Sequence, residues 1–526
     1  MSSSLRRLLT GVCHPSNRCK SFAVHLAGII SWRLLADSMR FTAGQVITID
    51  DLPDDVLLAM FDFYVAKDQG LPTFISISEK REIESWQSLV HVCRRWRGLV
   101  FASPRRLNLR LWYTARMSIN VWPAIPLLIR REDYSVDDVI ADLEYSNRIR
   151  QLEIYVDQYS TREIKQLWTA MQVPFPKLAA LLLAHDDSSS VPVLPDSFLG
   201  GSAPRLRSLI LDSIPFPGIP KLLLSATHLG LLFLTNIPHS AYISPEAMAT
   251  CLSPLTSLQI LNLGFESPRS CPDLESQPPF LPTRFDIPIL SHFMFKGASE
   301  YFEEFLARID APQICWLSIT FFNDIHHDTS ELTQFISRTP NLGVYDEASL
   351  TFHDREAIVR LQPHPGSSDD RMVEVNILCL VSDWPLSSMA QICTLSFRPL
   401  LTMENLYIYE DLYPRPVWED DIEDTEWLDL WLNLLHPFSD VKNFYLSRQI
   451  ASRIAPALQE LTGERTTEVF PALQNLFLEG FRPSEPVHEG IARFISARQL
   501  INHPVVISVW DKPGAGYESE DPVVGD

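Results

Sequence analysis

One pattern of apolar residues recurs along most of this chain. It consists of an apolar residue, two others, a second apolar residue, one other and a third apolar residue. The clearest copies begin at Ile149, Leu178, Leu206, Leu229, Leu258, Leu290 and Ile314. Weaker copies begin at Val375, Met403, Val441 and Leu473, with a partial one at Leu350-x-Phe352. Each copy indicates a short strand, and the copies follow one another at steps of roughly 23 to 38 residues.

Amphipathic segments lie between these copies. Residues 299–309, 330–336 and 427–435 carry apolar side chains at three- and four-residue steps, as helices with one buried face do. A strand followed by a helix cannot bury its faces alone, so neighbouring units must stack. We therefore expect an α/β fold in which residues 109–510 form an irregular solenoid with a parallel inner sheet. A doubly wound α/β domain also alternates strands and helices, but about a dozen copies in one direction favour the solenoid.

The copies resemble degenerate leucine-rich repeats, although the asparagine expected after each strand is mostly absent. In such a solenoid the residues flanking the second apolar position point away from the core. Tyr407, Tyr445, Phe477 and Trp316 occupy these places, so they are the predicted substrate-binding residues. Asparagines accompany the late copies, and two further residues share the inner face of the middle copies: Asn405, Asn443, Asn475, His292 and Met294. The competing interpretation is that a C-terminal segment or a neighbouring loop covers this face.

Residues 46–108 have a different pattern, that of a small helical module. Asp50 or Asp51 can cap a first helix that has Pro53 in its first turn. The apolar face of this helix comprises Val56, Leu57, Met60, Phe61 and Tyr64. A second helix, with Trp86, Leu89, Val90, Cys93, Trp96 and Val100 at helical spacing, is expected to end at Ser103-Pro104. Two short helices cannot hide this many large apolar residues, which indicates a partner protein.

The sequence Leu52-Pro53-x-x-Val56-Leu57-x-x-Met60-Phe61, followed by Val92-Cys93-Arg94-Arg95-Trp96, resembles the F-box. That module docks a substrate receptor onto the Skp-type adaptor of SCF (Skp–cullin–F-box) ubiquitin ligases. The resemblance covers roughly one tenth of the chain, and the connection between Tyr64 and Trp86 is longer than in a compact F-box. It implies that Leu52, Pro53, Val56, Leu57, Met60 and Phe61 contact the adaptor. Leu89, Val92 and Trp96 would complete that surface or the packing beneath it.

The implied function is that of a non-catalytic substrate-recognition subunit. Its expected partners are a Skp-type adaptor, the cullin ligase core and a target protein. The alternative is a repeat scaffold in which the N-terminal hairpin caps the open solenoid end, without a link to ubiquitin transfer. Phosphate-binding glycine loops, nucleophile motifs and zinc-ligand spacings are absent from the sequence, so no enzyme activity, cofactor or metal is expected.

Charge and cysteine content limit the class of function and the cellular location. The chain has 526 residues and a formal net charge of −21, which argues against a nucleic-acid surface. Its eight cysteines include no Cys-x-x-Cys pair, and several lie in apolar runs, as reduced core thiols do. A cytoplasmic or nuclear location is therefore expected.

The two ends of the chain differ from the rest. Residues 1–45 form a basic leader expected to be flexible, with an organellar presequence as the alternative. Its apolar run, residues 22–30, is too short to cross a membrane, which takes about 20 residues. Residues 511–526 are rich in glycine, proline and acids, and are expected to be a disordered tail.

Overall fold

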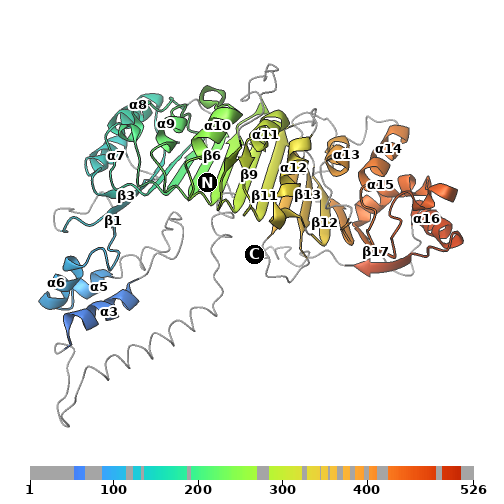
Figure 1. The fold of residues 1–526 in the computed structure, drawn as a ribbon, viewed down its shortest axis with the longest axis horizontal. Helices are drawn as coiled ribbons and strands as arrows, with labels where there is room; N and C mark the ends of the chain where they lie inside the picture. Colours follow the sequence, from blue (N-terminus) through green and yellow to red (C-terminus); the bar gives the residue numbers. More distant parts are fainter. Residues whose placement is uncertain are drawn as a thin grey trace, which may run out of the picture. The chain divides into compact units, whose positions relative to one another are not determined.

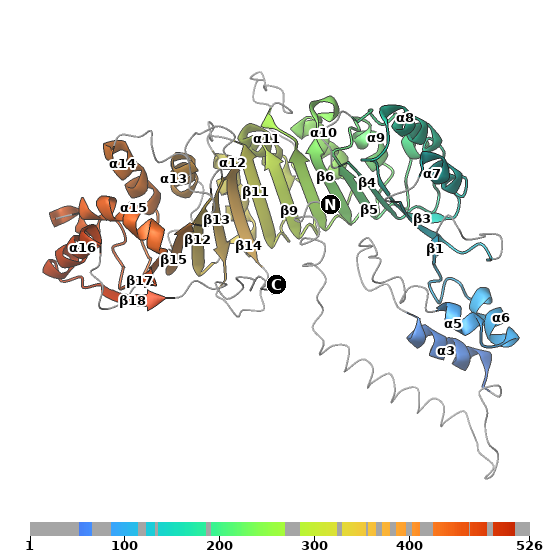
Figure 2. The same cartoon turned by 180° about the vertical axis from the view of Figure 1, so that it is seen from behind.

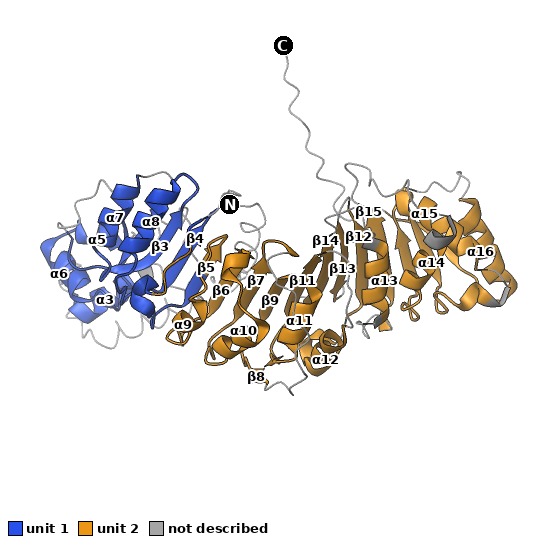
Figure 3. Ribbon diagram, turned by 90° about the horizontal axis from the view of Figure 1, so that it is seen from above, with its two compact units in different colours: residues 1–192, 197–209 blue, residues 193–196, 210–526 orange. Residues whose placement is uncertain are grey.

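The computed structural model describes residues 52–65, 86–113, 122–131, 135–185, 191–268, 284–322, 329–343, 345–353, 356–363, 371–378, 385–395, 402–410, 424–461, 463–480 and 488–510. The predictions for the leader, the tail, the Asp50 and Asp51 cap and the connection between Tyr64 and Trp86 fall mostly outside these ranges. Two compact units divide the chain: residues 1–192 with 197–209, and residues 193–196 with 210–526 (Figure 3). Each unit is described by itself.

The first unit begins with the helical module, which consists of α3 (Asp54–Tyr64), α5 (Trp86–Val90) and α6 (Arg94–Ala102). The prediction of one continuous second helix was wrong, because residues 91–93 separate α5 from α6. Cys93 has extended backbone angles (φ −154°, ψ 172°), and its Sγ accepts the N–H of Trp96 at 3.4 Å. Cys93 therefore serves as the N-cap residue of α6. Helix α6 ends at Ala102, directly before Ser103-Pro104, as predicted.

Parallel strands follow the module in the first unit. Strands β1 (Leu111–Tyr113), β2 (Leu127–Arg131), β3 (Ile149–Tyr155) and β4 (Ala180–Ala184) pair in chain order. Helices α7 (Val136–Leu143) and α8 (Thr161–Ala170) connect β2 to β3 and β3 to β4. Ser160 and Glu163 form a capping box at the start of α8, which fixes the turn out of β3. The copies predicted at Ile149 and Leu178 are confirmed, whereas β1 and β2 have no matching copy in the sequence pattern.

The second unit continues with the same strand–helix alternation. Its first strands are β6 (Leu231–Ile237), β7 (Ile260–Phe265), β9 (His292–Gly297) and β11 (Trp316–Phe322), which pair as parallel neighbours. Strand β5 (Ser208–Asp212) contains residues of both units. The connecting helices are α9 (Ile219–Leu223), α10 (Pro245–Leu252), α11 (Ser299–Leu306) and α12 (Ser330–Arg338), and Figure 1 shows α10, α11 and α12 side by side along the strands. Two short strands, β8 (Phe285–Asp286) and β10 (Ile309–Asp310), form a separate parallel pair.

A hairpin interrupts the parallel order in the middle of the second unit. Strands β12 (Glu347–Phe352), β13 (Glu356–Gln362) and β14 (Met372–Leu378) lie in the sequence β11-β14-β13-β12-β15, with β13 antiparallel to both neighbours (Figure 2). Only three residues separate β12 from β13, too few for the crossover that a parallel pair requires. The predicted copy at Val375 also has a different register, since Val373, Val375 and Ile377 are the buried residues.

Parallel pairing resumes after the hairpin. Strands β15 (Asn405–Glu410), β16 (Asn443–Leu446), β17 (Asn475–Glu479) and β18 (Val506–Trp510) pair in order. The accompanying helices are α13 (Pro385–Leu395), α14 (Asp424–Leu435), α15 (Arg448–Gln459) and α16 (Glu489–Leu500). Single 3₁₀ turns occur at Phe198–Gly201, His239–Ala241, Pro340–Leu342 and Gly463–Thr467. The repeats thus form an irregular solenoid of the leucine-rich-repeat type with a large, mainly parallel sheet.

The core consists of the apolar rows that the pattern predicts. Its first position is buried in copy after copy, as at Leu206, Leu229, Leu258, Leu290 and Ile314. Aromatic residues thicken the core beside β9, where Phe295 and Phe302 have ring centroids 4.7 Å apart. Stacking of repeats is therefore what removes these side chains from water, at roughly 25 cal/mol per Å² of apolar surface.

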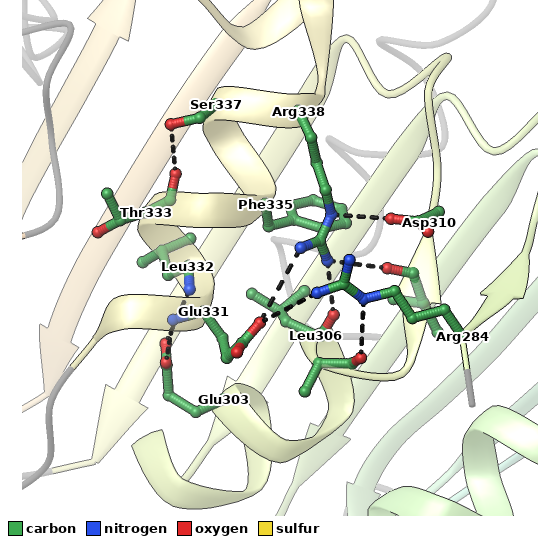
Figure 4. Close-up of polar contacts among 12 residues, drawn as sticks. Arg284, Glu303, Leu306, Asp310, Glu331, Leu332, Thr333, Phe335, Ser337 and Arg338 are labelled. Atoms are coloured by element: carbon green, nitrogen blue, oxygen red, sulfur yellow. Dashed lines mark hydrogen bonds and ion pairs between the residues drawn. The ribbon is translucent and has the colours of Figure 1, made fainter. Parts of the chain in front are cut away.

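Helices α11 and α12 also cap one another, as Figure 4 shows. The Glu303 carboxylate in α11 accepts the backbone N–H groups of Glu331 (2.7 Å) and Leu332 (3.1 Å) at the start of α12. In return, Nη2 of Arg338, at the end of α12, donates to the carbonyls of Leu306 (2.9 Å), the last residue of α11, and Ile309 (3.1 Å), three residues further on. An acid at a helix start and a cation at a helix end both complement the helix dipole.

Candidate protein-interaction surfaces

Helix α3 presents two apolar stripes that lie next to each other. Leu57, Phe61 and Val65, spaced by four residues, are buried. Val56, Met60 and Tyr64 follow the same spacing one residue earlier, which turns them by about 100° around the helix. Met60 is 42% and Tyr64 54% exposed, and Val56 is half-buried. One stripe is thus the core of the module, and the other is an apolar surface open to solvent.

Contacts from α6 hold α3 in this orientation. Arg95 forms an ion pair with Asp54 (Nη2 to Oδ1, 2.6 Å) and donates to the carbonyl of Leu52 at 2.5 Å. The rings of Phe61 and Trp96 have centroids 4.7 Å apart. Because both ends of α3 are tied to the same helix, its exposed stripe has a defined orientation within the module.

The nine residues implied by the F-box resemblance divide into three groups. Leu57, Phe61 and Leu89 are buried, Leu52, Val56 and Trp96 are half-buried, and Pro53, Met60 and Val92 are exposed. The expectation that Leu57 and Phe61 contact an adaptor directly needs correction, because both side chains pack inside the module. The surface a partner could reach is formed by the other two groups, together with Tyr64.

Trp86 in α5 connects the module to the start of the first sheet strands. Its Nε1 donates to the carbonyl of Arg110, the residue before β1, at 2.8 Å. Its ring lies edge-on to Phe101 in α6 and Trp122 before β2, with centroids 6.1 and 5.4 Å away. The module therefore shares a small aromatic core with the beginning of the repeats.

In the second unit, one sheet face carries the predicted substrate-binding residues. Burial alternates along β9, β11, β15, β16 and β17, so that every second side chain is half-buried. Trp316 lies on this face and stacks on His292 of the neighbouring strand, with centroids 5.9 Å apart. We call the face that carries Trp316, Tyr407, Tyr445 and Phe477 the inner face.

Tyr407, Tyr445 and Phe477 form a continuous stack on the inner face, which we call the aromatic ladder. The centroids of Tyr407 and Tyr445 are 4.2 Å apart, and those of Tyr445 and Phe477 4.3 Å, with planes 12° and 7° from parallel. Beside it, Asn443 donates to Asn405, and Asn475 donates to Asn443, each at 2.8 Å. In-register strands place like residues side by side, so the ladder stabilises the sheet whether or not it binds a partner.

Trp510, which the sequence did not single out, covers part of the aromatic ladder. It lies at the end of β18, and its ring is edge-on to Tyr407 and Tyr445 at 5.9 and 5.6 Å. Its Nε1 donates to the carbonyl of Leu446 at 3.2 Å. The sequence left open that a C-terminal segment covers this face. Among the described residues, Trp510 covers part of it. Phe477 and Tyr445 remain half-buried.

Burial and a neighbouring carboxylate perturb Tyr407. Its hydroxyl lies 3.5 Å from Glu347 Oε1, in hydrogen-bonding range. Burial and then the negative charge of Glu347 raise the pKa of Tyr407 above its ordinary value. The hydroxyl stays protonated at neutral pH, so it acts here as a hydrogen-bond donor.

A shallow groove of about 500 Å³ lies between α9 and α10, with Leu224 and Ala247 among its lining residues. Within the ranges given above, no group of three His, Cys, Asp or Glu side chains could hold a metal ion. Burial raises the pKa of the Cys251 thiol to about 12, which makes this thiol unreactive. None of the helices in those ranges has the length and apolar character to cross a membrane.

No protein-family model and no curated protein sequence matches this chain. Among solved structures, it is similar to the leucine-rich repeat-containing protein LegL7 from Legionella pneumophila, at 13% identity, covering 75% of this chain and 97% of that one, with a TM-score of 0.26. The solenoid is defined by the strands and helices of this chain itself.

Proposed function

We propose that this protein is a non-catalytic substrate-recognition subunit of a Skp–cullin ubiquitin ligase. The helical module would dock on a Skp-type adaptor, and the inner face of the repeats would hold the target protein. Catalysis would belong to other subunits, and this chain would supply proximity and orientation. The resemblance of residues 52–96 to the F-box motivates the proposal.

The observation that carries it is the exposed stripe of α3. A short helix gains no burial of apolar surface by leaving Met60 and Tyr64 exposed, and Val56 half-buried, beside a stripe that is already buried. Val92, 58% exposed in the turn before α6, adds a further apolar side chain to the surface of the module. Exposed apolar residues gathered on one small module are typical of a protein-docking surface.

The test is co-purification with a Skp-type adaptor. Met60→Glu places a charge in the proposed contact without touching the module core, so adaptor binding should fall at least tenfold while the melting temperature stays unchanged. Leu224→Glu, at the 63% exposed Leu224 of the second unit, is the matched control and should bind normally. Retention of the adaptor by Met60→Glu, or failure of the unaltered chain to bind it, would refute the proposal.

A second function is favoured by the contacts of Trp86. In this alternative the module caps the first strands of a repeat scaffold and has no role in ubiquitin transfer. Solenoids require a cap over their terminal repeat, and Trp86 shares its aromatic cluster with Trp122.

The two proposed functions predict different effects of substitutions in the module. Leu52→Ala combined with Pro53→Ala changes the surface of the module, and should remove adaptor binding with an unchanged melting temperature if the module docks an adaptor. If the module is only a cap, there is no adaptor binding to lose. Trp86→Ala, by contrast, should lower the stability of the first unit under either function.

A further inference from the structure

Within the described part of the chain, the apolar core of the second unit ends at β18. Ile507 and Val509 are in register with Leu476 and Leu478 of β17, so they continue the buried rows by one strand. Yet Val509 is 45% exposed, whereas Leu478 is buried. Leu500 and Ile501, at the end of α16, are 87% and 38% exposed. Val509, Leu500 and Ile501 are thus three exposed large apolar side chains within ten residues. Val506, in register with Asn475 on the inner face, is also exposed.

The backbone of β18 also has a free edge. The N–H of Val506 donates to the carbonyl of Gln474 at 2.9 Å, so Val506, Ser508 and Trp510 point their polar groups at β17. In a parallel strand, the backbone N–H and C=O groups of the residues in between point to the opposite side of the strand. The N–H and C=O groups of Ile507 and Val509 therefore face away from β17, and within the described part of the chain β18 pairs with β17 alone.

We propose that a second copy of this chain docks on this edge, with the two β18 strands antiparallel about a two-fold axis through Ser508. In that arrangement Ile507 of each copy lies opposite Val509 of the other. Both are residues with outward N–H and C=O groups, which is the geometry of a hydrogen-bonded antiparallel pair. Ser508 then faces Ser508 of the second copy as a non-hydrogen-bonded pair.

The side chains of β18 are suited to pairing with β18 of a second copy. Residues 506–510 contain no charge and no proline, the two devices that commonly protect an edge strand. Pairing Ile507 with Val509 places apolar side chains of both copies on the core side, so each copy covers the open end of the other. The two-fold axis makes the contact self-complementary and closed, as in most soluble dimers.

The chain's own tail is a poorer occupant of the edge. Residues 511–526 include five acids and two prolines, a composition that disfavours strand formation. The dimer is independent of the ubiquitin-ligase proposal, because it uses the C-terminal end of the second unit and no residue of the helical module.

Sedimentation velocity of the full-length chain tests the dimer. The unaltered protein should sediment as a species of twice 59.9 kDa. Val509→Lys puts a charge at the new edge and should give a monomer with an unchanged melting temperature. Val173→Lys, at a valine of similar exposure (43%) in the first unit, should remain a dimer. A monomer at every soluble concentration of the unaltered protein would overturn the proposal.

Cross-linking tests the register. Opposed residues of a non-hydrogen-bonded pair have Cα atoms about 4.5 Å apart, within the range that a disulfide spans. Ser508→Cys should therefore give a covalent dimer under mild oxidation. Val506→Cys, which lies opposite Trp510 of the second copy, should not cross-link to itself. Equal cross-linking of both variants, or none by Ser508→Cys above the level of the unaltered chain, would contradict this register.

Discussion

Strands β3 and β4 in the first unit differ from β9 and β11 in the second, although the same spacing of apolar residues produces both pairs. In β4 the residue between the core positions is Leu182, which is as buried as they are. In β9 the corresponding residue is Met294, which is half-buried. The spacing therefore specifies a strand, and the residue between the core positions decides whether the second face of that strand is available to a partner.

This difference predicts the largest effect on stability. Leu182→Ala should destabilise the protein by about 2 to 4 kcal/mol, similar to Leu183→Ala on the core side, because both remove a buried side chain. Met294→Ala should cost about 1 kcal/mol or less. Urea unfolding of the three variants measures the change in the free energy of unfolding. An effect of Leu182→Ala as small as that of Met294→Ala would remove the distinction between the two regions.

One ion pair from the sheet of each unit should show a difference in the same direction. Glu153 of β3 is buried and lies 3.5 Å from the Nε of Arg130, whereas the Arg360 and Glu374 pair of β13 and β14 is partly exposed. Arg130→Ala should cost about 1 to 3 kcal/mol, because a buried charge loses a partner. Arg360→Ala should cost less than about 1 kcal/mol.

A double variant distinguishes the loss of the ion-pair partner of Glu153 from the loss of packing by the Arg130 side chain. If the lost charge partner causes the effect of Arg130→Ala, adding Glu153→Gln should restore part of the stability. The absence of any restoration would assign the effect to the packing of the Arg130 side chain.

The aromatic ladder should contribute less than a buried core residue. Tyr445 stacks on both neighbours, so Tyr445→Leu should cost about 1 to 2 kcal/mol, at roughly 0.5 to 1.5 kcal/mol per aromatic pair. Tyr445→Phe keeps both stacks and should change thermal stability little. A Tyr445→Leu variant as stable as the unaltered chain would leave the ladder without a structural role and strengthen its assignment to target binding.

At neutral pH the smallest effect is expected from the titration of Tyr407, which changes stability only in alkaline solution. Its pKa is raised in the folded state above the ordinary value of 10.0. The folded state thus holds this proton more tightly, so stability is constant below pH 10.0 and falls as the pH rises above it. Comparison of the unaltered chain with Tyr407→Phe in alkaline urea unfolding measures the difference, and equal slopes for both proteins would contradict the raised pKa.

Much of the fold could be predicted, because apolar spacing reports directly on what is buried. The copies at Leu229, Leu258 and Leu290 coincide with β6, β7 and β9, and the helix predicted from Ser330 coincides with α12. The β12–β13–β14 hairpin could not be predicted from the repeat, because its pattern alternates with a period of two and the short loop reverses the chain. The helical module was predicted as two helices, since the cap formed by Cys93 depends on a backbone angle.

The candidate surfaces were only partly predictable. Helical spacing identified five residues of the apolar face of α3, but not which stripe α6 would cover, because that depends on the orientation of Phe61 against Trp96. The five are Val56, Leu57, Met60, Phe61 and Tyr64. On the inner face, strand periodicity placed Tyr407, Tyr445 and Phe477 together. The position of Trp510 above them depends on how β18 pairs with β17, which no local pattern encodes.

The mutual caps of Glu303 and Arg338 have a consequence for how the repeats come apart. If α12 unwinds at its start, Glu303 loses the amides it binds; if it unwinds at its end, the carbonyls after α11 lose their cation. Opening of either helix thus weakens the adjoining one, so amide protons in α11 and α12 should report similar opening free energies in hydrogen exchange.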